Sequence, residues 1–338
     1  MTMTCLQSQV SALLLALLAS AAQLTEAAPC PTPPPALQDM QGNGYYSDKN
    51  HSIVDPQLKA QNEAAAKPFT DFADQVSRRA DRVLAGAPDA GDSAECALTW
   101  LQQWAAGDAM LGHIASSQAQ YLRKWTLASL SLAYLKLRSR AEAAQREAID
   151  AWLRRVARAS LEHIRHSKAA RNNHHYWVGL AVMATASATG DATLRQDARE
   201  LFDEALSDIQ DDGSLPQELA RAGKALAYHN YALAPLVLMA ELAAREGEDW
   251  YALRGARLDL LVERTAAGIA DPAWFVARTG LSQEVPRGGI TGWALLYAQR
   301  GAARSQRVSG LLTQGLLRNV TLGGDLQLMA ARRFFSNP

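Results

Sequence analysis

Apolar residues recur at helical spacing over most of the chain. The spacing is clearest in two sets, Phe69, Phe72, Val76 and Val83, and Leu98, Leu101 and Trp104. Positions three and four apart share one face of a helix, so each set predicts an amphipathic helix. Strand patterns are scarce, and the sequence therefore predicts a chain that is nearly all helix after residue 55.

Further helical segments, separated by Gly, Asp or Pro, extend this pattern toward the C-terminus. They are expected at residues 118–137, 141–164, 176–188, 194–209, 225–244, 253–267 and 291–299. Several of their apolar faces are rich in alanine, which lets neighbouring helices approach closely over long contacts. The sequence has no fixed-period repeat, so it favours an array of helical hairpins over a standard solenoid and leaves a diverged toroid of helix pairs open.

Residues 1–27 are predicted to be a signal peptide. The apolar run at 11–19 is too short to span a bilayer, and the small residues at 25–28 offer a cleavage site. The alternative is a buried helix. We therefore expect export to the periplasm and a single mature domain at 28–338.

Export changes how the three cysteines are interpreted, because Cys5 would leave with the signal peptide. Cys30 and Cys96 would then form an isolated pair in a compartment where disulfides persist, which predicts a bridge between them. Two free thiols would require reducing conditions. The histidines and remaining cysteines lack the usual zinc spacings, so we expect no metal and no cofactor.

The 34 basic and 34 acidic side chains cancel. No field of the whole molecule then attracts nucleic acid or an anionic membrane, and we expect neither as a partner. An anionic ligand would have to be held by a local cluster of side chains. We also expect the protein to be a monomer.

Two short stretches carry most of the candidate chemistry. They are Asn-Asn-His-His-Tyr-Trp at 172–177 and the run at 221–231 that ends in Ala-Tyr-His-Asn-Tyr. Together they supply an amide, an imidazole, a guanidinium and a phenol, which can neutralise a carboxylate and move a proton beside it. The first stretch comes just before an apolar helix, where backbone donors favour an anion. The alternative is an Asn cap with incidental histidines.

The second stretch would lie on one helix if the helix expected at 225–244 extends back to Arg221. Arg221 and Tyr228 would then be two turns apart on one face, as would Lys224 and Tyr231. A cation beside a phenol stabilises the phenolate and lowers the pKa of the hydroxyl. The alternative is that both tyrosines are core aromatics with a solvated hydroxyl.

Two segments without helical period are candidate functional loops. Residues 41–57, which include Lys49, would form a lid, and an untethered mature N-terminus is the alternative. Asp211, Asp212 and Glu218 lie around a sharp break in the second segment and are candidates for the two carboxylates of a hydrolase. A helix-breaking turn explains these three acids more simply.

The two chemical stretches also resemble a known family, the bacterial alginate lyases of polysaccharide lyase family five. The similar motifs are the one at 172–177 followed by Val-Met-Ala-Thr-Ala at 182–186, and Leu-Pro-Gln-Glu-Leu at 215–219 leading into 225–233. Further matching pieces occur in the same order at 96–104, 123–125, 130–134 and 322–325. The resemblance covers most of the mature chain.

The resemblance implies an all-α fold, an incomplete (α/α) toroid or barrel of antiparallel helical hairpins, with a groove for an anionic uronate polysaccharide such as alginate. It implies that Asn173, His174 and Arg221 neutralise the C5 carboxylate of the substrate. Tyr228 matches the catalytic tyrosine, and Lys49 matches a lid lysine that reaches over the substrate. Further substrate contacts are expected from Ser117, Gln118, Arg123, Trp177, Lys224, His229 and Tyr231.

The implied reaction is β-elimination of poly-β-D-mannuronate without a metal. The negative carboxylate resists removal of the neighbouring C5 proton, so it must be neutralised first. Tyr228 would then take the proton as a phenolate, or share it with His174, which could also act as the base. In mannuronate the C5 proton and the O4 leaving group lie on one face, so Tyr228 could act as base and then as acid. The product would carry a 4,5-unsaturated uronate at its non-reducing end.

Other functions are compatible with the same residues. Ala220 stands where the family has a basic residue, and Lys224 where an arginine is usual, so the preference among mannuronate, guluronate and glucuronate polymers stays open. A polyglucuronate or mixed-uronate lyase would present a similar groove. A non-catalytic periplasmic polysaccharide-binding protein could also retain the fold and the cationic groove.

Overall fold

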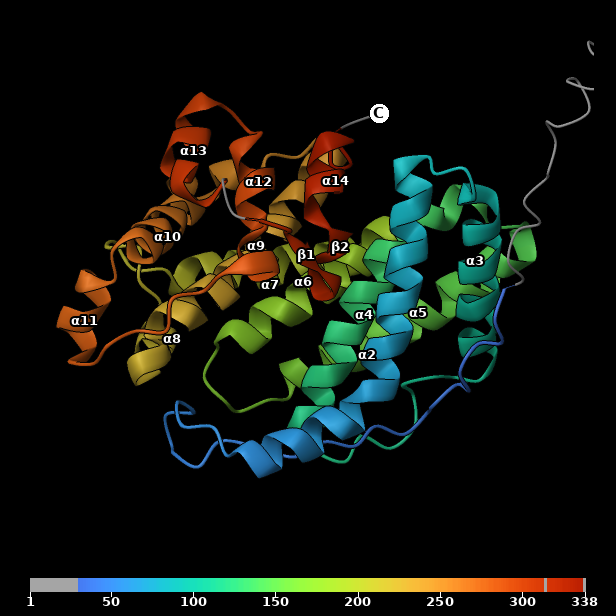
Figure 1. Ribbon diagram of the computed structural model, residues 1–338, viewed down its shortest axis with the longest axis horizontal. Coiled ribbons are helices and arrows are strands. Elements are labelled where there is room, and N and C mark those ends of the chain that lie inside the picture. The colour runs from blue at the N-terminus through green and yellow to red at the C-terminus, as the bar shows by residue number, and fades with distance from the viewer. Residues whose placement is uncertain (1–29, 313–314, 337–338) are drawn as a thin grey trace, which may run out of the picture. The chain divides into compact units, whose positions relative to one another are not determined.

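The computed structural model describes residues 30–312 and 315–336 (Figure 1). The chain divides into two compact units, Met1–Pro31 and Thr32–Pro338, and the helices below belong to the second. The predicted signal peptide and Cys5 lie outside the described residues. Within the described residues, no helix is long and apolar enough to cross a membrane.

Long helices account for most of the described chain, as the apolar spacing predicted. They are α2 (Pro56–Ala85), α3 (Ala90–Ala106), α4 (Ser117–Leu137), α5 (Ala143–Arg165), α6 (Asn173–Thr189), α7 (Ala192–Asp208), α9 (Ala225–Arg245) and α10 (Leu253–Ala270). Shorter helices follow at α11 (Ala273–Thr279), α12 (Trp293–Ala298), α13 (Ala302–Arg307) and α14 (Leu326–Ala331). In the described part of the chain, strands are confined to the pair β1 (Arg318–Asn319) and β2 (Gly324–Asp325).

The long helices pack in two layers that alternate along the chain. In one layer α2, α4, α6 and α9 follow one another as neighbours, and in the other α3, α5, α7 and α10 do so. Each successive pair crosses between the layers, as α2 does with α3 and α6 with α7. This arrangement is an all-α toroid of antiparallel helical hairpins, which confirms the predicted fold class.

Helix α6 is apolar on nearly every face because neighbouring helices cover it. It packs against α4, α5, α7 and α9, and every residue from Tyr176 to Ala186 is buried. The contact with α9 is close, since a Cβ added to Gly179 would lie 2.9 Å from the Cε of Met239. A helix packed this tightly fixes the position of the residues in its first turn.

A buried ion pair ties the C-terminal hairpin to α2 and α4. The Nζ of Lys136 lies 2.6 Å from Oδ1 of Asp81 and donates to the carbonyl of Gly323 at 2.6 Å. Arg318 approaches the same carboxylate at 3.8 Å. Burial lowers the pKa of Lys136, whose side chain has no exposed surface, and the contact with Asp81 opposes this effect.

Cys30 and Cys96 form a disulfide, which confirms the predicted bridge. The segment that follows Cys30 is held by main-chain hydrogen bonds to the residues after α3. The amide of Met110 donates to the carbonyl of Leu37, and the amide of Met40 donates to that of His113, both at 2.9 Å. These hydrogen bonds hold the backbone before residue 41, where the lid segment begins, in a fixed position.

Candidate active site

A cavity of about 820 Å³ opens between the first turns of α4, α6 and α9. We call it the groove. The segment 284–287 lines one part of it, and residues 44–46 of the predicted lid line another. The lid prediction itself stays a prediction, although this segment does border the cavity.

Arg221 and Tyr228 meet in the groove, but they do not share a helix. Arg221 follows the short helix α8 (Pro216–Leu219), and the backbone turns at Ala222, which has a φ of 55° in the left-handed region. The prediction that the two residues lie two turns apart on one helix is therefore wrong. The Cζ atom of Arg221 nevertheless lies 4.7 Å from the centroid of the Tyr228 ring.

The hydroxyl of Tyr228 is paired with that of Tyr46, at an oxygen–oxygen distance of 2.9 Å. Burial raises the pKa of Tyr228 above the ordinary value of 10.0, and the hydrogen bond with Tyr46 raises it further. The guanidinium of Arg221 lowers the pKa, as expected of a nearby cation, but burial outweighs it. Tyr228 is therefore a neutral phenol in the free protein.

His174 lies in the first turn of α6, which Asn172 caps by accepting a hydrogen bond from the His174 amide at 2.9 Å. Its Nδ1 is 2.9 Å from the Nζ of Lys124, and Tyr121 stacks on its ring with a centroid separation of 3.5 Å. Burial, and then the charges of Lys124 and Arg221, lower the pKa of His174 well below 6.5. The imidazole is therefore neutral at pH 7.

Asn173 lies behind His174 and is completely buried. Its main-chain amide donates to Oε1 of Glu218 at 2.6 Å, and its side-chain amide donates to the same carboxylate at 3.0 and 3.1 Å. Glu218 also approaches Nε of Arg221 at 3.6 Å. The side-chain oxygen of Asn173 has no hydrogen-bond partner among the described residues. One buried carboxylate thus links two of the residues expected at the substrate carboxylate.

Four of the expected substrate-contacting residues line the groove: Ser117, Gln118, Lys224 and Tyr231. The ammonium of Lys224 is 3.0 Å from Glu284, so it is paired with an acid rather than with the phenol that helical spacing had suggested. The ring of Tyr231 is flanked by other aromatic rings of the groove wall. Ser117 and Gln118 begin α4, whereas Lys224 and Tyr231 lie before and on α9, so the two pairs meet only in the folded chain.

Three other expected contacts lie elsewhere. Lys49 is exposed and does not line the groove, although Tyr46 and His51 on either side of it do. Trp177 is buried, and its indole donates to a main-chain carbonyl of α9 at 3.1 Å. His229 is also buried, with both ring nitrogens bonded to main-chain atoms at 2.7 and 3.0 Å. Trp177 and His229 therefore support the groove wall from behind.

The acids that a hydrolase would need are not gathered in the groove. Asp211 is paired with Arg257 at 2.7 Å and Asp212 with Arg278 at 3.3 Å, and neither lines the groove. Glu218 is buried beneath the groove wall. Across the described ranges there is also no group of three or more His, Cys, Asp or Glu side chains that could hold a metal ion.

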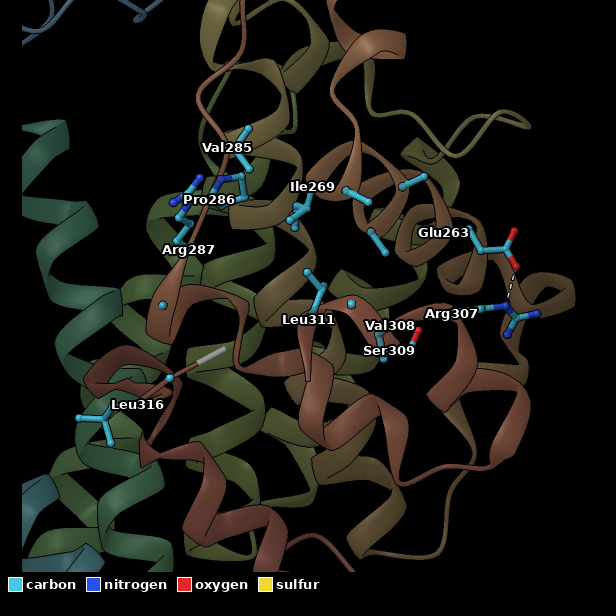
Figure 2. Close-up of a pocket in the computed structure, with 16 residues that line it drawn as sticks. Glu263, Ile269, Val285, Pro286, Arg287, Arg307, Val308, Ser309, Leu311 and Leu316 are labelled. Atoms are coloured by element: carbon cyan, nitrogen blue, oxygen red, sulfur yellow. Dashed lines mark hydrogen bonds and ion pairs between the residues drawn. The ribbon is translucent and has the colours of Figure 1, made fainter. Parts of the chain in front are cut away.

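Two further cavities adjoin the groove. One of about 1060 Å³ shares the residues from Val285 to Arg287 with it, and Figure 2 shows Arg287 on the side opposite the ion pair of Glu263 and Arg307. That ion pair has an N–O distance of 2.5 Å, whereas Arg287 is exposed and has no ion-pair partner among the described residues. Arg287 is thus a cation free to meet a ligand between the two cavities.

The other adjoining cavity, of about 780 Å³, lies beyond Tyr121 and His174, which line both spaces. Arg123 and His163 line it, so Arg123 borders this cavity instead of the groove. Arg123 donates from Nη2 to a main-chain carbonyl of α5 at 2.8 Å. The groove therefore shares lining residues with a second cavity on one side and a third on another.

Four residues at or behind the groove have no role predicted from the sequence. Tyr46, Tyr121 and Arg287 line the groove, and Lys124 is buried beside His174. Tyr121 and Lys124 stand one helical turn apart beside Trp125, and this mixture of aromatic and cationic residues on one predicted helix was an available signal. Tyr46 and Arg287 lie in irregular segments. Their approach to the groove depends on loop paths that periodicity does not encode.

An all-α toroid with an open groove that combines cationic and phenolic side chains offers a binding site for an acidic polymer. The sequence model of the alginate lyase family matches residues 39–275, which is more than half of the chain. A "Polysaccharide lyase" of Stenotrophomonas maltophilia is 44% identical over 330 residues, covering 97% of each chain. The protein described here belongs to the alginate lyase family.

Other relatives agree with this assignment. An "Alginate lyase" of Pseudomonas putida is 33% identical over 269 residues, covering 75% of this chain and 71% of its own. The crystal structure of alginate lyase A1-III from Sphingomonas species A1 matches with a TM-score of 0.73 and 27% identity, over 91% of this chain and 86% of that one. A variant of A1-III in complex with a tetrasaccharide matches with a TM-score of 0.78 and 26% identity, over 95% and 94% of the two chains.

Proposed function

We propose that the protein depolymerises alginate, cleaving the β-1,4 bond next to β-D-mannuronate by β-elimination. The observation that carries this proposal is the meeting of Tyr228, Arg221 and His174 in one groove, with a guanidinium 4.7 Å from the phenol ring. Membership of the alginate lyase family, and the tetrasaccharide bound by a structural neighbour, support a polymeric uronate as the substrate.

Neutralisation of the C5 carboxylate is the first requirement of this chemistry. Arg221 supplies a permanent positive charge in the groove, and His174 supplies a neutral ring beside it. When C5 loses its proton, the electron pair left behind delocalises onto the carboxylate. Hydrogen bonds to the carboxylate therefore stabilise the transition state. We assign both residues to this role, and we place Asn173 in support of them through the Glu218 carboxylate.

Tyr228 is assigned the proton transfers. It removes the C5 proton as a phenolate and then returns a proton to the O4 leaving group on the same face of mannuronate. Its raised pKa means that the free protein holds the phenol form, so Tyr228 must first give its own proton to solvent before it can accept the C5 proton. Its hydroxyl must also leave Tyr46 to reach the substrate. Among the causes of the shift, only the charge of the Arg221 guanidinium favours the phenolate.

The polymer is proposed to extend from the groove into the adjoining cavities. Ser117, Gln118 and Tyr231 would contact the sugar at the site of cleavage, and Arg287 would pair with the carboxylate of a neighbouring uronate. Lys49 remains our candidate for a lid lysine. It would need to turn from its exposed position to reach a bound chain.

One assay tests the proposed function. The purified mature protein is incubated with polymannuronate, polyguluronate and polyglucuronate, and the ultraviolet absorbance of the unsaturated product is followed beside a reducing-end assay. We expect absorbance to rise fastest with polymannuronate. Fastest turnover of another polymer would reassign the substrate, reducing ends without absorbance would indicate hydrolysis, and binding without either signal would indicate a non-catalytic binding protein.

We also propose a periplasmic location, with residues 28–338 as one mature monomeric domain. The disulfide between Cys30 and Cys96 supports an oxidising compartment. Fractionation of the source cells, N-terminal sequencing of the exported protein and light scattering of the purified chain test the three parts separately. A cytoplasmic, uncleaved or dimeric protein would each overturn one part.

A further inference from the structure

Lys124 is a buried lysine to which the proposed function gives no role. It lies on α4 with 2% of its surface exposed, and it has no ion-pair partner among the described residues. Burial lowers the pKa of Lys124 well below its ordinary value, and no acidic group opposes that effect. A buried cationic group without an acid is costly, so its surroundings must supply other compensation.

Those surroundings consist of groups that accept hydrogen bonds or attract a cation. The Nζ atom lies 2.9 Å from Nδ1 of His174 and donates to the main-chain carbonyl of His174 at 3.1 Å. It also lies 4.3 Å from the centroid of the Tyr121 ring and 5.5 Å from that of Trp125. Two aromatic faces favour the ammonium form, which carries three donors and no acceptor.

A donor at Nδ1 determines the tautomer of the imidazole. If Lys124 donates to Nδ1, that nitrogen must present its lone pair, and the single proton of the neutral ring lies on Nε2. Tyr121 meanwhile fixes the plane of the ring, because the two rings stack at 3.5 Å with an interplanar angle of 11°. The ring therefore has both its orientation and its proton position specified from α4.

We propose that Lys124 is a positioning residue that holds His174 with its proton on Nε2, so that His174 donates a hydrogen bond to the substrate carboxylate and does not act as a base. This inference rests on the proposed function. It resolves the two roles that the residue types alone left open for His174. Tyr228 is then the side chain in the groove that accepts the C5 proton.

The charged groups around His174 disfavour the protonated imidazolium form of its ring. The groups that act on the ring are Lys124 from α4, Arg221 from the turn before α9 and His51 from the lid segment, and each lowers the pKa of His174. Burial acts in the same direction and is the largest cause. A neutral ring with a fixed tautomer is consistent with a hydrogen-bond donor that does not gain or lose a proton during turnover.

The tautomer can be read directly in the free protein by nitrogen NMR of ¹⁵N-histidine-labelled samples. The chain has seven histidines, and a His174→Gln sample identifies the signals that belong to His174. We expect wild-type His174 to show a protonated Nε2 and an unprotonated Nδ1. A protonated Nδ1 would overturn the proposal, because Lys124 would then accept rather than donate.

Lys124→Met removes the donor while keeping an unbranched side chain of similar length. We expect the NMR signals of His174 to change toward a mixture of tautomers, the pKa of His174 to rise, and kcat to fall about 100-fold with a smaller change in KM. Lys67→Met, at an exposed residue of α2 paired with Asp71, is the matched control and should leave all three unchanged. Retention of the Nε2 tautomer and of kcat in Lys124→Met would contradict the proposal.

The two proposals fail in different ways. If the wild-type protein has the Nε2 tautomer but cleaves no uronate polymer, the proposed function fails, and the part of the inference that concerns turnover fails with it. If the protein cleaves polymannuronate but His174 is protonated on Nδ1, only the role of Lys124 is overturned. Circular dichroism identifies a Lys124→Met sample that has not folded, in which case the wild-type tautomer decides the question.

Discussion

The hydroxyl of Tyr46 lies 2.9 Å from the hydroxyl of Tyr228, although 182 residues separate them in the sequence. Tyr46 belongs to the lid segment, and Tyr228 to the first turn of α9. The contact raises the pKa of Tyr228, the residue to which we assign the proton transfers. The free groove therefore holds Tyr228 in a form that does not yet act as a base.

Tyr228→Phe should abolish turnover and leave substrate binding largely intact. The variant keeps the ring that faces Arg221 but removes the hydroxyl to which we assign the proton transfers, so we expect kcat to fall by at least about 10³-fold. Steady-state assays and calorimetry with a mannuronate oligosaccharide measure the two effects. Full activity in this variant would refute the assignment of Tyr228.

The rate of the wild-type enzyme should rise with pH. The pKa of Tyr228 is raised above 10.0, so the phenolate fraction is small at pH 7 and grows about tenfold for each pH unit below that pKa. His174 has a lowered pKa and stays neutral over the same interval, so it adds no falling limb. Measurement of kcat/KM between pH 6 and pH 9 tests this sign, and a rate that falls steadily over this interval would contradict it.

Tyr46→Phe should move the rising limb of that profile to lower pH. The change removes a hydrogen bond that raises the pKa of Tyr228, while the guanidinium of Arg221 remains in place. The ring that stacks near His51 is retained, so the lid segment keeps its packing. The same kcat/KM series on both proteins reports the free protein, and an unchanged profile would contradict a contribution of this hydrogen bond to the pKa of Tyr228.

Glu218→Gln should lower kcat by about tenfold or more while the protein stays folded, because the groups that Glu218 holds lose their fixed geometry. The carboxylate accepts hydrogen bonds from the main-chain and side-chain amides of Asn173 and approaches Arg221. A glutamine side chain has one acceptor oxygen and cannot accept hydrogen bonds from all of these donors. Burial raises the pKa of Glu218, so removal of its charge also removes a desolvation cost. Thermal unfolding and kinetics together separate loss of geometry from loss of fold.

Asp81→Asn should destabilise the protein by about 3 to 5 kcal/mol, because it leaves the buried Lys136 without its carboxylate. Urea unfolding measures the change. The exposed pair of Lys67 and Asp71 offers the control, since Asp71→Asn should change stability by about 1 kcal/mol or less. Equal effects of the two substitutions would show that the buried pair adds no more than a surface contact.

The helices and the chemical groups of the site could be predicted from the sequence, but the connections between them could not. Apolar spacing located α2 and α5 because burial on one face leaves a helical period in the residues. The left-handed turn at Ala222 has no such signal, so Arg221 was placed on the wrong element. The raised pKa of Tyr228 could not be predicted from the sequence either, because desolvation depends on which chain segments cover the hydroxyl.

The supporting residues show the same limit. Trp177 and His229 carry residue types that often contact sugars, yet both are buried and bonded to main-chain atoms. Lys124 was visible in a motif, but its role depends on a distance of 2.9 Å between two helices. Sequence spacing predicts which face a residue occupies on its own helix and gives no distance to the next one.

The disulfide at the start of the described chain affects what a protease could do to the enzyme. A single cut between residues 47 and 55 would separate the backbone of the lid segment on the C-terminal side of Tyr46, but Cys30 would still be bonded to Cys96 and the residues near Met40 would keep their main-chain hydrogen bonds. The severed piece would therefore remain attached. A nicked molecule should lose Tyr46 from the groove only when a reductant is also present, so proteolysis and reduction would inactivate the enzyme together rather than separately.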